Sequence, residues 1–186
     1  MSTIVFVAVI SAATLHAVWN ALAKGGNDKF LSMTAVALGH TPIAIAVLFF
    51  VPIPTPESWP YALFGMFLHT GYQLFLLAAY RIGDLTQVYP IARGTAPLLV
   101  AGISIIFLGV ELAPLEIVAV LTIAAGILSL SLVRQNDGLR NGKASLLAFT
   151  TGCFIASYSL VDGSGARLSG SPFAFYAWVA IGNSVL

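Results

Sequence analysis

The stretch WPYALFGMFLHTGYQLFLLAAYRIGDLTQVYPIARGTAPLLV, from Trp59 to Val100, joins two long apolar runs through the short polar turn RIGD. Each run has about the 20 residues that an α-helix needs to cross a bilayer. Because lipid offers backbone groups no hydrogen-bond partner, such runs are expected to be helical. The stretch therefore predicts two membrane-spanning helices with a tight turn between them, and it raises the question of why the second one carries Arg93.

The composition extends this prediction to the whole chain. Of the 186 residues, 59% are hydrophobic and only 8% are charged, whereas soluble domains carry about 25% charged residues. The net charge of +1 and the lack of a basic patch give no support for a nucleic-acid partner. The single cysteine, Cys153, lies in an apolar run and is interpreted as a small core residue. We expect an all-α protein, a polytopic transmembrane helical bundle.

Six full apolar windows and the start of a seventh are present. They run over Thr3–Ala23, Phe30–Val51, Trp59–Tyr80, Leu85–Val110, Leu115–Val133 and Ala144–Val161, and the seventh begins near Ser171. Because the seventh run is cut off at Leu186, we expect the chain to be a fragment. Lys and Arg prefer cytoplasmic loops, and the loops after the first, third and fifth spans hold all but two of them. This distribution predicts an external N-terminus.

Two similar segments indicate an internal repeat. LHAVWNALAKGG ends the first span, and FIASYSLVDGSG ends the sixth. Aligning Ala17 with Ala156 places Trp19 on Tyr158, with glycines following in both segments. An odd number of spans separates the copies, so they would cross the membrane in opposite senses, as in an inverted repeat.

Polar side chains inside the spans gather toward one membrane face. At 1.5 Å per residue, they lie roughly 3–16 Å from the basic-side ends of their helices. Three i,i+4 pairs each share a helix face: His16/Asn20, His69/Gln73 and Tyr89/Arg93. The candidate substrate-binding residues are His16, Trp19, Asn20, His69, Tyr72, Gln73, Tyr89 and Arg93. They predict a wet cavity lined by the first four helices, with Arg93 as the anion contact.

Each candidate also has a purely structural interpretation. A buried histidine often only forms hydrogen bonds that stabilise the fold, and Trp19 could anchor its helix at the membrane interface. Asn20 and Gln73 suit hydrogen bonds between helices, and Arg93 could extend its charge to the interface. Pro90 and Pro97 are candidate hinges, because a proline removes a backbone donor and loosens the helix one turn earlier. A fixed kink is the alternative for both prolines.

The acidic residues bear on the class of substrate. All seven are predicted in loops or at span ends: Asp28, Glu57, Asp84, Glu111, Glu116, Asp137 and Asp162. Without a carboxylate inside the membrane, a proton-coupled exporter of cations is disfavoured. Arginine and histidine instead favour an anionic or zwitterionic metabolite, and histidine is the candidate carrier if protons are coupled. No catalytic motif, cofactor motif or metal-ligand spacing indicates an enzyme.

Three segments resemble one transporter family. LHAVWNALAKGG, AYRIGDLTQVYPIARGTAPLLV and GILSLSL are similar to the EamA-type transporters of the drug/metabolite transporter superfamily, and YSLVDGSGARLSGSP resembles the start of that family's second half. The most specific part is the Gly83–Asp84 turn followed by an apolar helix with Pro97.

The resemblance implies ten helices in two inverted five-helix repeats around a central substrate cavity. Residues 1–133 would form the first repeat, 134–142 a linker, and 143–186 an incomplete second repeat. It also implies a secondary transporter, usually an exporter, of small metabolites across the bacterial inner membrane. The alternatives are a non-transporting membrane assembly subunit, a nonfunctional fragment and, less favoured, a lipid-modifying membrane enzyme.

Overall fold

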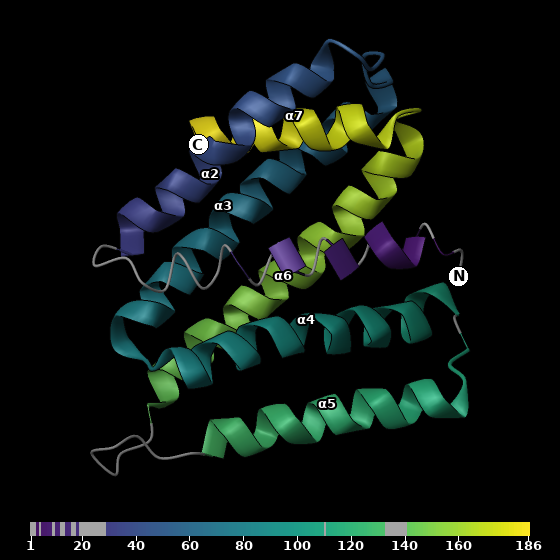
Figure 1. The fold of residues 1–186 in the computed structure, drawn as a ribbon. Coiled ribbons are helices and arrows are strands. Elements are labelled where there is room, and N and C mark those ends of the chain that lie inside the picture. The colour runs from purple at the N-terminus through teal and green to yellow at the C-terminus, as the bar shows by residue number, and fades with distance from the viewer. Residues whose placement is uncertain are drawn as a thin grey trace.

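The computed structural model describes residues 29–109, 111–132 and 141–186, together with scattered positions between 3 and 18. The described residues form helices and connecting turns without a β-strand, which confirms the all-α prediction. The elements are α2 (Lys29–Leu48), the 3-10 turn η1 (Pro56–Ser58), α3 (Trp59–Ile82), α4 (Leu85–Leu108), α5 (Pro114–Leu132), α6 (Gly142–Leu168) and α7 (Pro172–Val185) (Figure 1).

Three of the described helical segments are long and apolar enough to cross a membrane. They are Pro56–Ile82, Thr86–Phe107 and Gly142–Leu168. Large apolar side chains such as Phe64, Phe67 and Leu74 point outward from α3 and are exposed. A soluble bundle would place polar groups there, so these surfaces fit a lipid environment. The structure thus supports a membrane protein.

The end of α6 differs from the prediction. The sixth span was expected to end at Val161, with DGSGARLSG as a loop, but the helix continues to Leu168. Aspartate and glycine are poor helix formers, yet packing often overrides such weak preferences. Here Phe175 and Tyr61 pack where a Cβ at Gly165 would lie, at 2.5 and 2.6 Å. The helix ends at Leu168 with Ser169 as its C-cap, and the next residue, Gly170, adopts the left-handed φ of 69°.

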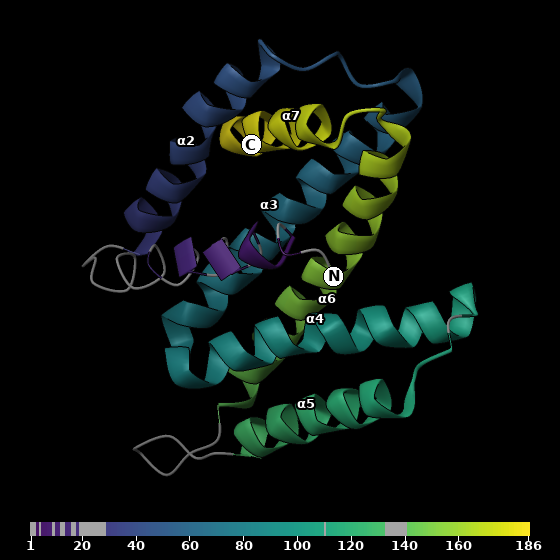
Figure 2. The same cartoon turned by 45° about the vertical axis from the view of Figure 1, so that its right-hand side comes forward.

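Helix α6 is the central element of the described bundle, because it packs against both α3 and α4 (Figures 1 and 2). Its buried face repeats a small residue every four positions: Ala144, Ala148, Gly152 and Ala156. Small residues at this spacing let neighbouring helices approach closely within a membrane. The same stripe therefore explains why two helices can contact α6 at once.

The contacts along α3 and α6 define an antiparallel pair. Gly83, just after α3, faces Ala144 near the start of α6, whereas Gly65, early in α3, faces Asp162 late in α6. The basic residues that border these two ends, Arg81 and Lys143, therefore share one end of the bundle. This arrangement agrees with the charge asymmetry of the loops.

The remaining helices form two flanking pairs. α5 lies beside α4 (Figure 1), with Ile127 against Gly94. α2 packs against α7, where Thr41 Oγ1 donates to Ser184 Oγ at 2.6 Å. Of these helices, α4 and α7 contact the α3–α6 unit directly, whereas α5 packs mainly against α4 and α2 mainly against α7.

Candidate functional site

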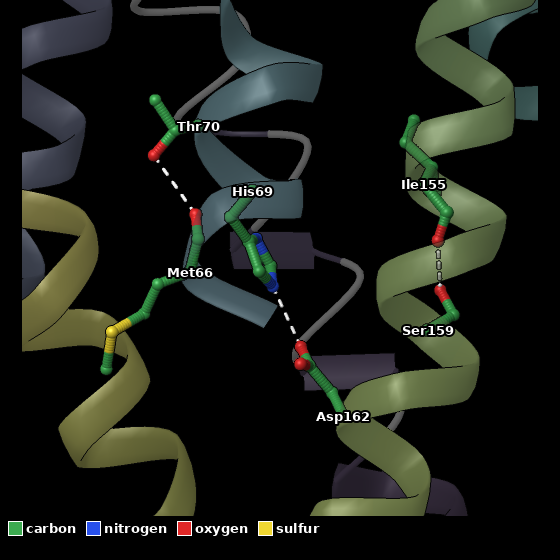
Figure 3. Close-up of polar contacts among 6 residues, drawn as sticks. All are labelled: Met66, His69, Thr70, Ile155, Ser159 and Asp162. Carbon is green, nitrogen blue, oxygen red and sulfur yellow. Dashed lines mark hydrogen bonds and ion pairs between the residues drawn. The ribbon is translucent and has the colours of Figure 1, made fainter. Parts of the chain in front are cut away.

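An ion pair joins α3 to α6 inside the bundle. His69 Nε2 lies 2.8 Å from Asp162 Oδ2, and the two side chains retain 19% and 4% of their exposure (Figure 3). His69 lies ten residues after Trp59, which is roughly 15 Å along α3. The pair is therefore well inside the membrane-length part of the helix.

This position corrects the expectation for one of the seven acids. Asp162 was predicted at a span end, but it lies within α6 and is 3% exposed. A charged group enclosed at this depth is costly unless it is paired, and such groups are usually functional. A buried carboxylate is thus present within a membrane-length helix, so the premise that disfavoured a proton-coupled exporter of cations is wrong.

Neighbouring hydroxyl side chains donate hydrogen bonds to backbone carbonyls of their own helices. Thr70 Oγ1 donates to the Met66 carbonyl at 3.0 Å, and Ser159 Oγ donates to the Ile155 carbonyl at 2.7 Å (Figure 3). Such back-bonding is the ordinary fate of hydroxyl groups in membrane helices. His69 and Asp162 instead bond across the helix interface, so they link the relative positions of α3 and α6.

Gly65 provides the space that the carboxylate occupies. A Cβ at position 65 would lie 2.3 Å from Asp162 Oδ1. This oxygen is buried and has no hydrogen-bond partner among the described residues. A buried polar atom without a partner is uncommon in folded proteins, and among the described side chains His69 is the hydrogen-bond partner of this carboxylate.

The first prediction concerns this contact. Gly65→Ala is expected to push the carboxylate away from His69 and to lower the free energy of unfolding by about 1–3 kcal/mol. Thermal unfolding in detergent would measure the change. Gly163→Ala is the control, since a Cβ at position 163 meets nothing within 4 Å, and it should be neutral or stabilising. Equal effects of the two substitutions would contradict this role of Gly65.

Two tyrosines pack around the ion pair. The Tyr158 ring stacks on His69 with centroids 3.9 Å apart and an interplanar angle of 21°. Tyr72 meets the His69 ring edge-on at 5.8 Å and the Tyr158 ring at 5.4 Å. These ring contacts place two phenol side chains beside the pair.

Arg93 reaches this group from α4. Its Cζ lies 5.8 Å from the centroid of the Tyr89 ring, a cation–π distance. Its positive charge interacts electrostatically with Tyr158 and with Tyr72. We use the name central cluster for five residues from three helices: His69, Tyr72, Arg93, Tyr158 and Asp162.

The structure thus brings together part of the predicted site. His69 and Tyr72 are in ring contact, Tyr89 lies beside Arg93, and Gln73 is half-buried on α3. Pro90 and Pro97 both lie within the helix α4. The candidates His16, Trp19 and Asn20 lie outside the described residues.

Tyr158 and Asp162 were not among the candidates. They are spaced i,i+4 on α6, the same spacing that pointed to Tyr89 and Arg93. The i,i+4 spacing in the sixth span would have identified both residues, but Asp162 lies beyond Val161, where that span was predicted to end. Among the described residues, no three histidine, cysteine or acidic side chains gather as metal ligands would.

The chain was compared with family models, curated proteins and solved structures, and none of them matches it.

Proposed function

We propose that this chain belongs to a secondary transporter that moves small anionic or zwitterionic metabolites across the bacterial inner membrane. The observation that carries the proposal is the buried His69–Asp162 pair with Arg93 nearby, in a bundle with membrane-length helices. Ionisable groups enclosed at this depth typically mark substrate or ion pathways. The resemblance to EamA-type transporters, with its inverted repeats, export and ten helices, remains part of the proposal.

The charges of the central cluster favour a ligand with two kinds of group. Arg93 can bind a carboxylate or phosphate through paired hydrogen bonds. Asp162 adds a negative charge to the same cluster, and a negative charge favours an ammonium group. A zwitterion therefore has a partner for each end, whereas a simple anion would have a partner only in Arg93 and the tyrosine hydroxyls.

The same contacts would also suit a non-transporting membrane assembly subunit. In such a protein the buried polar groups would hold helices together, as hydrogen bonds between membrane helices do. The close ring stacking of His69 on Tyr158 is compatible with that role. A transport measurement is needed to separate the two functions.

The second prediction tests Arg93. In proteoliposomes containing the purified chain, uptake of carboxylate, phosphonate and amino-acid metabolites is compared between wild type and variants. Arg93→Ala is expected to reduce uptake of the transported compound by about tenfold or more, since a charge-assisted hydrogen bond contributes about 1.5–3 kcal/mol. Arg93→Lys keeps the charge but loses the paired geometry, so it should be intermediate.

Arg81→Ala is the matched control, because Arg81 is an exposed arginine in the last turn of α3. It should transport like wild type. Normal uptake by both Arg93 variants would leave Arg93 as an interfacial anchor and remove it from the binding site.

A further inference from the structure

We propose that His69 is the proton-binding site of this carrier, with Asp162 as its fixed counter-charge, and that protonation of the pair controls how tightly α3 and α6 close. The inference rests on the proposed transport function and adds a coupling ion and its residues to it. It is carried by the placement of an imidazole and a carboxylate on two different helices.

The positive charge of a protonated His69 compensates the buried carboxylate of Asp162 and thereby stabilises the contact between α3 and α6. Asp162 Oδ2 accepts from His69, while Oδ1 faces Gly65 and has no hydrogen-bond partner among the described residues. When the imidazole loses its proton, the hydrogen bond can remain but the opposite charge is gone. An uncompensated buried carboxylate is strongly destabilising, so the contact between the two helices weakens.

The two partners also differ in access. His69 keeps 19% of its side-chain exposure, whereas Asp162 keeps 4%. The imidazole is therefore the more exposed of the two groups. Histidine is the side chain whose charge ordinarily changes between pH 5 and 8.

Among the residues that the structure describes, the other side chains facing the pair ordinarily keep their charge state in this range. Tyr72 and Tyr158 face it from α3 and α6, and Tyr176 on α7 interacts electrostatically with Asp162. Tyrosine ordinarily stays neutral below about pH 9. Arg93 approaches from α4 through Tyr158 and stays positive at all these pH values. His69 is therefore the group that can switch the cluster.

The third prediction is a pH-dependent loosening of α3 and α6. Amide hydrogen exchange is measured in lipid nanodiscs at about pH 6 and about pH 8, each corrected with the unfolded chain's exchange rate at that pH. In wild type, exchange in Trp59–Ile82 and Gly142–Leu168 is expected to be about tenfold faster, or more, at the higher pH. The response should disappear in His69→Gln and in Asp162→Asn.

A histidine outside the pair provides a control that leaves the pair unaltered. His40 lies on α2, outside the central cluster, and His40→Gln should keep the full response. A wild-type chain without the response, or a response lost in His40→Gln, would overturn the proposal. If the pair responds but no metabolite is taken up, the switch stands and the transport function fails.

Discussion

Replacing Gly152 with leucine is expected to separate α4 from α6 and to abolish most of the folded protein. A Cβ at position 152 would lie 2.5 Å from Thr95 Cβ and 3.0 Å from the carbonyl oxygen of Ala92. The second atom belongs to the α4 backbone, which cannot move aside as a flexible side chain could. Leucine adds three further carbons, so we expect a loss of at least about 3 kcal/mol in the free energy of unfolding.

The matched control is Gly126→Leu. Gly126 is also a glycine inside an apolar helix, but a Cβ there would meet nothing within 4 Å. Size-exclusion chromatography of the detergent-solubilised chain gives the monodisperse fraction of each variant, and thermal unfolding gives its stability. If Gly152→Leu behaves like Gly126→Leu, α6 is not packed against α4 as described.

The second large effect is expected from breaking the ion pair on one side. His69→Leu leaves the carboxylate of Asp162 buried without its partner, and removing one member of such a pair typically costs about 3–5 kcal/mol. The double variant His69→Leu/Asp162→Leu replaces both groups with apolar side chains of suitable size. It should recover most of the lost stability and be more stable than His69→Leu alone.

This comparison also separates structure from function. A pair that only holds helices together can be replaced by leucines without further loss, whereas a pair that binds substrate or protons cannot. We therefore expect the double variant to be folded but inactive in transport. A double variant no more stable than His69→Leu would show that Asp162 is not the buried charge whose compensation His69 provides.

The helices could be predicted from the sequence because length and hydrophobicity leave few alternatives in lipid. The observed bounds of α3, Trp59–Ile82, differ from the predicted window by two residues at its end. The continuation of α6 was missed because Asp162, Gly163 and Gly165 indicate a loop when considered alone. Phe175 and Tyr61 pack onto this segment, and this tertiary packing, which favours the helix, is not visible in the sequence.

The candidate site was predictable only within single helices. The i,i+4 rule correctly placed Tyr89 beside Arg93, since that contact needs no tertiary information. The approach of Asp162 to His69 depends on which faces of α3 and α6 meet. The small residues Ala148, Gly152 and Ala156 mark α6 as a close-packing helix, but they do not specify its partner.

The central claim is that the buried charges serve transport. It is tested most directly by metabolite uptake into proteoliposomes containing either the wild-type chain or the folded His69→Leu/Asp162→Leu variant. The account predicts saturable uptake of at least one zwitterionic or anionic compound by wild type and background uptake by the variant. Equal uptake by both proteins, or background uptake by both, would contradict it.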